Sequence, residues 1–239
     1  MAAIKNVLLI VVDQWRGDTL SYLGHPCIRT PAIDALCQGG VTFRNHYTTC
    51  APCGPARASL LTGLYMMNHR VVQNGVPMDA RHVTLPMEAR AAGYDPALVG
   101  YTTTSPDPRT TSPDDPRYRF RGATMPGWNP IAPMDPARRP YFNWLRQKGF
   151  GVPNEPEDIW LPAVGLETSG GATDAPSRIP RELSDTTWTT DHGLAYLGGM
   201  ERQSWFLHLG YFRPHPPFIA PAPYNDYYDP DEVPAPVRA

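Results

Sequence analysis

The sequence of 239 residues predicts an α/β fold, because apolar segments typical of buried strands alternate with segments of helical character. Residues 6–12 form a continuous apolar run rich in β-branched side chains, as expected of a central strand covered on both faces. Two further core strands are expected at residues 97–101 and 204–212. The first strand ends directly in Asp13, and the carboxyl ends of strands are where open α/β sheets bind ligands.

Helices are expected between these strands. The first begins at Thr30-Pro31 and ends at Gly39-Gly40, and its apolar spacing predicts Cys37 to be a core residue. Two others are expected at residues 84–92 and 183–197. A shorter helix is expected near residues 141–148.

Residues 50–63 contain the most informative segment, which reads CAPCGPARASLLTG. Pro55 suits a first helical position, and Gly63 is a natural helix stop. Cys53 is therefore expected at or just before a helix N-terminus, where free N–H groups and the helix dipole favour an anion or a thiolate. Arg57 follows one turn later, so it can point back toward Cys53.

This segment resembles the sulfatase signature of the alkaline-phosphatase superfamily. In that family a separate enzyme oxidises the motif's cysteine to Cα-formylglycine, whose hydrated aldehyde supplies the nucleophile. The similarity extends to the phosphonate monoester hydrolase branch through three more segments: NVLLIVVDQWR (6–16), GYDPALVGYTTTSPDPR (93–109) and FLHLGYFRPHPPF (206–218). The family's members are longer, so this sequence is expected to be their N-terminal half.

The resemblance implies an alkaline-phosphatase-like α/β/α sandwich with a mostly parallel central sheet, of which the C-terminal part is missing. Residues 1–239 would then be the N-terminal part of a single catalytic domain. A Pro-rich loop excursion is expected at about 105–183, since most of the chain's 29 prolines follow residue 105 and proline disfavours long helices.

The resemblance also implies a metal site. It assigns Asp13 and the formylglycine derived from Cys53 as metal ligands, with Gln14 as a further candidate. A carboxylate at a strand end is indeed a hard oxygen ligand for a divalent cation. On the residues alone, Asp13 could instead cap a helix.

The remaining site residues are carried over in the same way. The resemblance implies that Arg57 and His215 act with Cys53 in catalysis, and that Asn74, Tyr101 and Thr103 contact the substrate. Without the resemblance, Asn74 is equally an Asn-Gly turn residue, Tyr101 and Thr103 could be ordinary strand residues, and His215 could be structural.

Asp191-His192 looks like the metal-binding Asp-His pair of sulfatases. The family's pair follows a buried strand, whereas these two residues lie in the helix expected at 183–197. We therefore expect no metal here, and we expect the true pair beyond residue 239.

The function implied is metal-dependent hydrolysis of phosphonate or phosphate monoesters or diesters, with promiscuity toward sulfate esters. Its cofactors would be formylglycine and one divalent cation; Mn²⁺ or Ca²⁺ is favoured, and Mg²⁺ or Zn²⁺ is an alternative. Its partners would be a small-molecule ester and a formylglycine-generating enzyme, and a homo-oligomer is compatible with the family. The 239 residues alone are expected to be inactive.

Other functions stay open at this point. One is an arylsulfatase or choline-sulfatase-like enzyme, another a redox or metal protein built on Cys50-x-x-Cys53, and a third a truncated, non-catalytic homologue. The net charge of −2 gives no electrostatic case for nucleic-acid or membrane binding. The four cysteines lack the close spacing of a secreted framework, so we expect a cytoplasmic protein.

Overall fold

The computed structural model describes residues 6–115, 124–154, 156–160, 174–201 and 203–235. The chain divides into two compact units. The first unit comprises residues 1–13, 48–152 and 185–213, and the second comprises residues 14–47, 153–184 and 214–239. Each unit is described by itself below.

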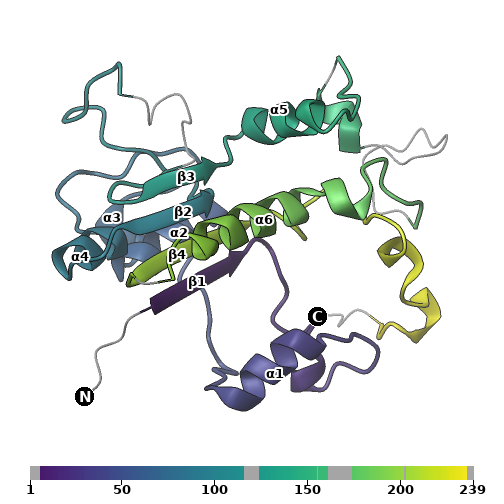
Figure 1. Cartoon of the computed structure of the whole chain (residues 1–239). Coiled ribbons are helices and arrows are strands. Elements are labelled where there is room, and N and C mark those ends of the chain that lie inside the picture. Colours follow the sequence, from purple (N-terminus) through teal and green to yellow (C-terminus); the bar gives the residue numbers. More distant parts are fainter. Residues whose placement is uncertain (1–5, 116–123, 155, 161–173, 202, 236–239) are drawn as a thin grey trace. The chain divides into compact units, whose positions relative to one another are not determined.

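A parallel sheet of four strands forms the centre of the first unit (Figure 1). The strands are β1 (Asn6–Val12), β2 (Pro96–Gly100), β3 (Asn129–Pro133) and β4 (Trp205–Tyr211), in the order β1-β4-β2-β3. β4 pairs with β1 on one side, with Leu8 opposite Leu207, and with β2 on the other, with Leu98 opposite His208. The three strands expected from the sequence are confirmed.

Strand β3 was not expected, because it lies inside the Pro-rich region. Its sequence NPIAP contains two prolines, which cannot donate to a sheet ladder. β3 occupies an edge of the sheet, where such residues are tolerated. The region from 105 to 183 therefore contributes to the sheet and is not loop alone.

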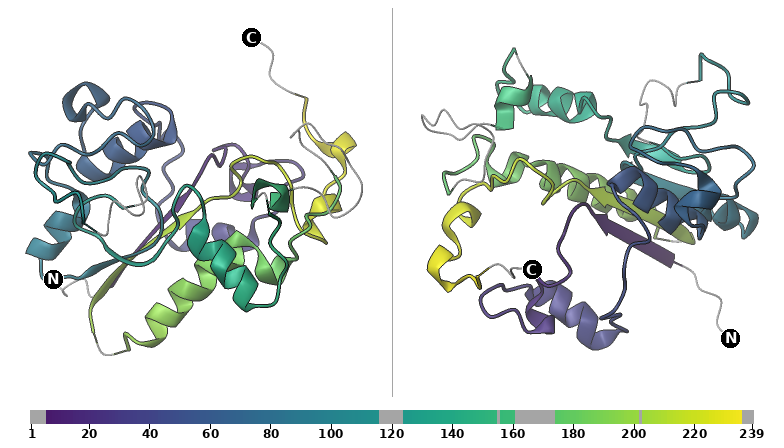
Figure 2. Two further views of the ribbon diagram at one scale, coloured as in Figure 1. Left: turned by 90° about the horizontal axis from the view of Figure 1, so that it is seen from above. Right: turned by 180° about the vertical axis from the view of Figure 1, so that it is seen from behind.

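Helices cover both faces of this sheet, giving the expected α/β/α arrangement (Figures 1 and 2). On one side lie α2 (Cys53–Thr62), α3 (Met66–His69) and α4 (Leu85–Ala91). On the other lies α6 (Asp185–Gly198), whose Gly193 approaches Leu209 of β4 so closely that a β-carbon would lie 2.9 Å from its methyl group. α5 (Arg139–Gln147) packs onto α6 through the rings of Tyr141 and Trp188, 6.3 Å apart.

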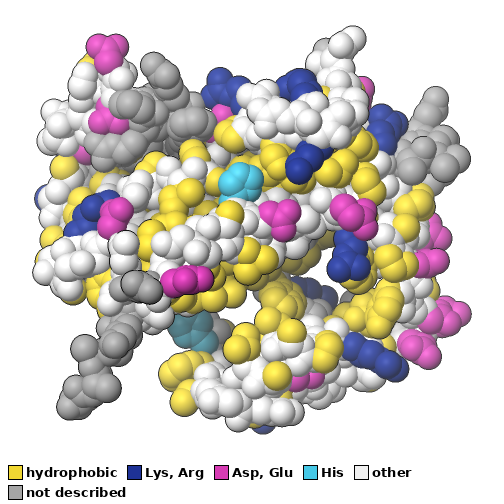
Figure 3. Space-filling view, viewed as in Figure 1, with side chains coloured by type: hydrophobic (Ala, Val, Ile, Leu, Met, Phe, Trp, Pro, Cys, Tyr) yellow, Lys and Arg dark blue, Asp and Glu magenta, His cyan; other side chains and the backbone are white. Residues whose placement is uncertain are grey.

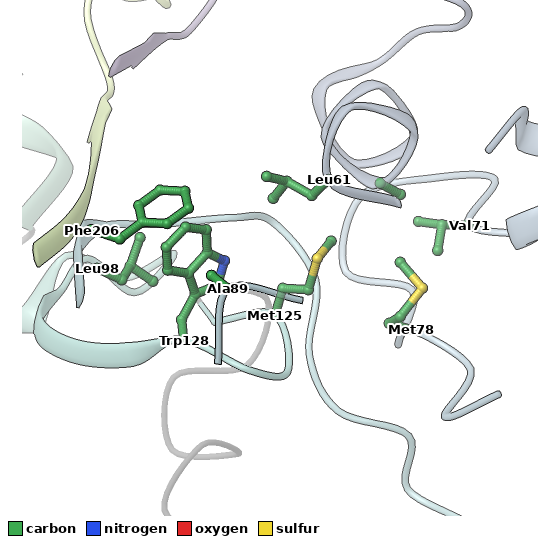
Figure 4. Packing of buried hydrophobic residues seen from close by; sticks show 9 residues of the cluster. Leu61, Val71, Met78, Ala89, Leu98, Met125, Trp128 and Phe206 are labelled. Atoms are coloured by element: carbon green, nitrogen blue, oxygen red, sulfur yellow. The ribbon is translucent and has the colours of Figure 1, made fainter. Parts of the chain in front are cut away.

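The main hydrophobic core fills the space between the sheet and the α2–α4 side (Figure 4). Leu98 and Phe206 face it from the strands, and Trp128 meets Phe206 edge-to-face at 5.4 Å. The labelled members are Leu61, Val71, Met78, Ala89, Leu98, Met125, Trp128 and Phe206. Burying each of the larger side chains contributes about 1.5–3 kcal/mol, so this cluster fixes α2 firmly against the sheet.

Strand β1 differs from its prediction in one respect. It was expected to be covered on both faces, but Leu8 is 47% exposed and Ile10 is 46% exposed. In the described part of the chain β1 is an edge strand, and about half of the surface of these two side chains stays exposed. Figure 3 shows hydrophobic side chains at the surface over β1 and along α6.

The described part of the second unit contains α1 (Pro31–Gly39) and short 3₁₀ helices, among them Ser21–Leu23, Arg181–Leu183 and Tyr224–Asp226. α1 is anchored through Asp34, which accepts hydrogen bonds from the Ser21 hydroxyl and the Tyr22 N–H. The prediction that Cys37 is a core residue is wrong. Cys37 is only half-buried and no residue of α1 is fully buried, because the helix packs against a short turn and not against a sheet.

Among the described residues, no helix combines the length and the apolar character that crossing a membrane requires.

Candidate active site at the carboxyl edge of the sheet

Two strand ends place Asp13 and Tyr101 side by side. Asp13 directly follows β1 and Tyr101 directly follows β2, and the carboxyl ends of parallel strands share one edge of the sheet. The Asp13 N–H extends the ladder by donating to the carbonyl of Tyr211 at 3.0 Å. The Tyr101 hydroxyl donates to Oδ2 of Asp13, and both side chains are buried.

Helix α2 begins earlier than the sequence suggested. Its first residue is Cys53 and its N-cap is the extended Pro52, so Pro55 lies within the first turn and not at the first position. Proline is tolerated throughout that turn, since those N–H groups have no partner within the helix. Gly63 ends α2 in the left-handed conformation at φ 70°, as predicted. Cys53 therefore lies at the helix N-terminus.

Arg57 reaches from α2 to the sheet edge. Its Nη1 donates to the carbonyl of Tyr101 at 2.9 Å, and its guanidinium lies 4.3 Å above the centre of the Tyr101 ring. Its Nη2 lies 3.7 Å from Oδ2 of Asp13 and makes no hydrogen bond to a described residue. Arg57 is only 4% exposed, so this guanidinium is held in place, and its Nη2 is a buried donor without a hydrogen-bond partner among the described residues.

Two glycines make room for this arrangement. A β-carbon at Gly210, in β4 between β1 and β2, would lie 2.9 Å from the Tyr101 carbonyl oxygen and 3.7 Å from Nη1 of Arg57. A β-carbon at Gly100 would lie 2.2 Å from the Gly210 oxygen, and Gly100 has a φ of +99°. Sequence reasoning missed both residues. Glycine inside a strand often marks such a close approach of backbones, and here each glycine precedes a tyrosine.

Asn74 caps the N-terminus of α2. Its Oδ1 accepts the N–H of Gly54 at 2.7 Å and the Cys53 thiol at 3.4 Å. The side chain thus satisfies one of the helix's unpaired N–H groups and fixes the start of α2. Asn74 is therefore more than a turn residue, and its amide oxygen lies at the Cys53 sulfur.

The backbone of Thr103 contacts the residue that follows Asn74. The Gly75 N–H donates to the Thr103 carbonyl at 3.2 Å, and the Thr103 hydroxyl donates to the carbonyl of Thr102 at 2.7 Å. Thr103 has a φ of 61°, a left-handed conformation that costs a β-branched residue about 1–3 kcal/mol. Strain of this kind is concentrated at functional sites, which favours a role for this turn.

The electrostatics of the cluster keep Tyr101 neutral. Burial raises the pKa of Tyr101 far above its usual value, the charge of Arg57 opposes this, and the Asp13 carboxylate that accepts from the hydroxyl adds to it. Its hydroxyl is therefore a permanent hydrogen-bond donor. Asp13 and Arg57 carry compensating charges.

His208 lies fully buried in β4, under this site, and was not singled out from the sequence. Its ring packs against Trp128 at 4.9 Å, and its nitrogens make no hydrogen bond to a described residue. Burial, reinforced by the positive charge of Arg57, lowers the pKa of His208 to about 3. The ring is therefore neutral and adds no charge behind Arg57.

Gln14 and His215 belong to the second unit. Gln14 is exposed and has a φ of 59°, and Nδ1 of His215 is 2.8 Å from the carbonyl of Pro216. Because each unit is described by itself, the predicted roles of these two residues at the site stay predictions.

The donors present fit only part of a metal site. The Asp13 carboxylate is a suitable ligand for a hard divalent cation at this sheet edge. No three His, Cys, Asp or Glu side chains gather around a common metal position among the described residues. Asp191 and His192 lie on α6 as expected, and Nδ1 of His192 is 2.8 Å from the Trp188 carbonyl.

The structure is a parallel α/β sandwich with a thiol at a helix N-terminus. A buried carboxylate, tyrosine and guanidinium lie beside this helix end, and together these features indicate the protein family. Residues 5–234 match the model of the sulfatase family, so the chain belongs to that family. The resemblance inferred from the signature is thereby confirmed.

Its similarity to particular proteins falls in the branch expected. The chain is 57% identical over 240 residues to the multifunctional alkaline phosphatase superfamily protein PehA of Trinickia caryophylli, covering 98% of this chain and 46% of PehA. It is 42% identical to the phosphonate monoester hydrolase structure of Agrobacterium radiobacter, with a TM-score of 0.88, covering 98% of this chain and 46% of that one. The phosphonate monoester hydrolase SpPMH of Silicibacter pomeroyi has the same TM-score and coverage at 39% identity. The chain thus spans about half the length of these relatives.

Proposed function

We propose that this chain carries the nucleophile half of a metal-dependent hydrolase of phosphonate or phosphate esters. The observation that carries the proposal is the cluster of Asp13, Tyr101 and Arg57 at the sheet edge, near Cys53 at the N-terminus of α2. The similarity to phosphonate monoester hydrolases supports this substrate class over others.

Cys53 is the proposed source of the nucleophile. Conversion of its side chain to an aldehyde, followed by addition of water, gives a carbon bearing two hydroxyls. One of these oxygens is placed at the helix N-terminus, where the dipole and the free N–H groups favour negative charge. Asn74, which already accepts from the Cys53 thiol and from the Gly54 N–H, would hold this group in position.

The metal ion is part of the proposal. Asp13 would supply one ligand, together with the modified residue 53, and Gln14 is a further candidate. A bound divalent cation, with Mn²⁺ or Ca²⁺ favoured, would lower the pKa of the nucleophile and neutralise charge on the group being transferred.

The remaining residues bind and orient the substrate. Nη2 of Arg57, which makes no hydrogen bond to a described residue, would hold the anionic oxygens, since guanidinium groups bind such oxygens by charge-assisted hydrogen bonds. Tyr101, Thr103 and Asn74 would position the same group, and His215 would add a donor from the second unit. Developing charge would then meet donors that are already in place.

The proposed reaction has two steps, a displacement at phosphorus and an elimination. In the first, one hydroxyl of residue 53 would lose its proton and its oxygen would bond to phosphorus while the bond to the leaving alkoxide or aryloxide breaks, and the leaving group would take up a proton. In the second, the other hydroxyl would lose its proton, its carbon–oxygen double bond would re-form, and the carbon–oxygen bond to the phosphoryl group would break. This releases the product acid and restores the aldehyde without attack by water on a crowded intermediate.

Hydrolysis of sulfate esters is the second candidate, favoured by the match to the sulfatase family as a whole. The same site geometry would serve a sulfuryl group. Rates on an aryl phosphonate and an aryl sulfate, measured side by side on the mature enzyme, separate the two functions.

The modification is the direct test of the proposal. The chain should be produced with a formylglycine-generating enzyme, and the tryptic peptide of residues 45–57 should be weighed and treated with an aldehyde-reactive probe. We expect Cys53, and not Cys50, to lose about 18 Da and to react with the probe. Active enzyme in which Cys53 is an unmodified thiol would refute the mechanism.

A further inference from the structure

The other cysteine of the signature, Cys50, lies in a hydrogen-bonded cluster of its own. Its Sγ is 3.5 Å from Oγ of Ser59 and 3.6 Å from Oγ1 of Thr49. Oγ of Ser59 is in turn 2.9 Å from Nε2 of His69. Ser59 lies in α2 and His69 ends α3, so these contacts join the segment before α2 to both helices.

The direction of these hydrogen bonds follows from the state of His69. The Val71 N–H donates to Nδ1 of His69 at 3.1 Å, so Nδ1 must carry a lone pair. His69 is only 1% exposed, and burial, with a further effect of His82, holds its pKa below the usual value. The ring is therefore neutral and its proton is on Nε2.

Nε2–H of His69 consequently donates to Ser59, and the hydroxyl hydrogen of Ser59 is left to donate to the Cys50 sulfur. The two sulfurs of the signature are thus directed to different partners. Cys50 is held by Ser59, whereas Cys53 contacts Asn74, and both are free thiols.

This separation has a chemical consequence. A Cys-x-x-Cys segment is short enough to close a disulfide ring. Such a disulfide would occupy Cys53, the residue from which the proposed nucleophile is made.

We propose that Ser59 and His69 are positioning residues that hold the Cys50 thiol away from Cys53 and so keep Cys53 unpaired. The importance of Cys53 rests on the proposed function, but the pairing of the two thiols is measured without any turnover. Failure of this inference and failure of the proposed function are therefore distinguishable.

The hydrogen bonds from His69 to Ser59 and from Ser59 to Cys50 form a relay. The reaction that this relay opposes is thiol–disulfide exchange with a small disulfide such as oxidised glutathione. One cysteine thiolate attacks a glutathione sulfur, forming a mixed disulfide and releasing one glutathione thiol. The other thiolate attacks the protein sulfur of the mixed disulfide and releases the second. Two protein thiols are oxidised and one glutathione disulfide is reduced to two thiols.

The test uses the 239-residue chain with unmodified Cys53, equilibrated in glutathione redox buffers. After quenching and alkylation, the tryptic peptide of residues 45–57 reports the internal disulfide: the disulfide form carries no alkyl group and is about 2 Da lighter than the unalkylated dithiol, whereas the reduced form carries two alkyl groups. Ser59→Ala should raise the equilibrium constant for the disulfide about two- to ten-fold, the contribution of one hydrogen bond. Thr62→Ala is the matched control on the same helix, because its hydroxyl donates to the Ala58 carbonyl and not to Cys50.

A second pair of variants tests the relay at His69. His69→Gln keeps an N–H donor near the position of Nε2, whereas His69→Leu removes it. His69→Leu should raise disulfide formation as Ser59→Ala does, and His69→Gln should stay closer to the unsubstituted chain. Equal disulfide constants for the chain, Ser59→Ala and Thr62→Ala would overturn the inference. If Ser59→Ala does not fold, equal constants for the two His69 variants overturn it instead.

Discussion

Gly210 gives the sharpest prediction about how the site is built. Replacing it by alanine would place a β-carbon 2.9 Å from the carbonyl oxygen and 3.1 Å from the nitrogen of Tyr101. Both are backbone atoms of the adjoining strand end, so they cannot move aside as a flexible side chain could. Tyr101 would have to shift, and with it the carbonyl that accepts from Nη1 of Arg57.

The expected magnitude follows from overpacking. Inserting a methyl group where there is no space costs about 1–3 kcal/mol. For a chain of this length each kcal/mol lowers Tm by about 2–4 °C, so Gly210→Ala should melt several degrees below the unsubstituted chain.

Thermal and urea unfolding, followed by circular dichroism, would measure this effect. Gly198→Ala is the control, because Gly198 ends α6 in the same unit and a β-carbon there meets nothing within 4 Å. In a mature, active enzyme Gly210→Ala should also lower kcat, because the Tyr101 carbonyl that holds Nη1 of Arg57 would be displaced. A Gly210→Ala chain as stable as Gly198→Ala would show that the close approach described here is wrong.

Three further predictions concern the Asn74 cap of α2, the stability of the chain at acid pH, and metal binding. Asn74→Ala should destabilise the chain by about 1 kcal/mol through loss of the α2 cap, while Asn74→Asp should retain most of that stability; urea unfolding decides. The Arg109 guanidinium, with backbone N–H groups of Ala80 and Arg109, lowers the pKa of Asp107. The ionised Asp107 therefore stabilises the fold above the unfolded pKa of about 3.9, and this stabilisation is lost as pH falls through the depressed folded pKa. Asp107→Asn should reduce the loss of unfolding free energy at acid pH, and an unchanged pH dependence would contradict this. The matured 239-residue chain with Mn²⁺ should bind the metal weakly and turn over an aryl phosphonate at no useful rate, since Asp13 supplies too few oxygen ligands; ready turnover that disappears in His192→Ala would instead place a metal at α6.

The parts of the fold that depend on local pattern were predictable from the sequence. The runs at residues 6–12, 97–101 and 204–212 became β1, β2 and β4, because short, continuous apolar runs rich in β-branched or aromatic residues favour strands. α2 was predictable through its helix-forming residues and the stop at Gly63. β3 was not, because its prolines argue against a strand and only its edge position permits them.

Burial was harder to predict than secondary structure. The spacing in α1 is helical, yet Leu36 is 67% exposed and Cys37 only half-buried, because periodicity does not tell how much of a helix has a partner. The same limit applies to β1, whose apolar run is that of a central strand although Leu8 and Ile10 are exposed in the described part of the chain.

Some residues of the candidate site can be predicted from a sequence motif, whereas their contacts can be known only from the structure. A signature marks Cys53 and Arg57, but not that Arg57 turns toward the backbone of Tyr101, 44 residues further along the chain. That contact exists because β4, the last of the described strands in the sequence, lies between β1 and β2 and has no side chain at Gly210. Asp13, Arg57 and Tyr101 come from three separate segments, and they meet only when β4 has brought the ends of β1 and β2 to the same edge. These three side chains therefore come from residues 13, 57 and 101, whereas the strand that brings them together comes from residues 205–211.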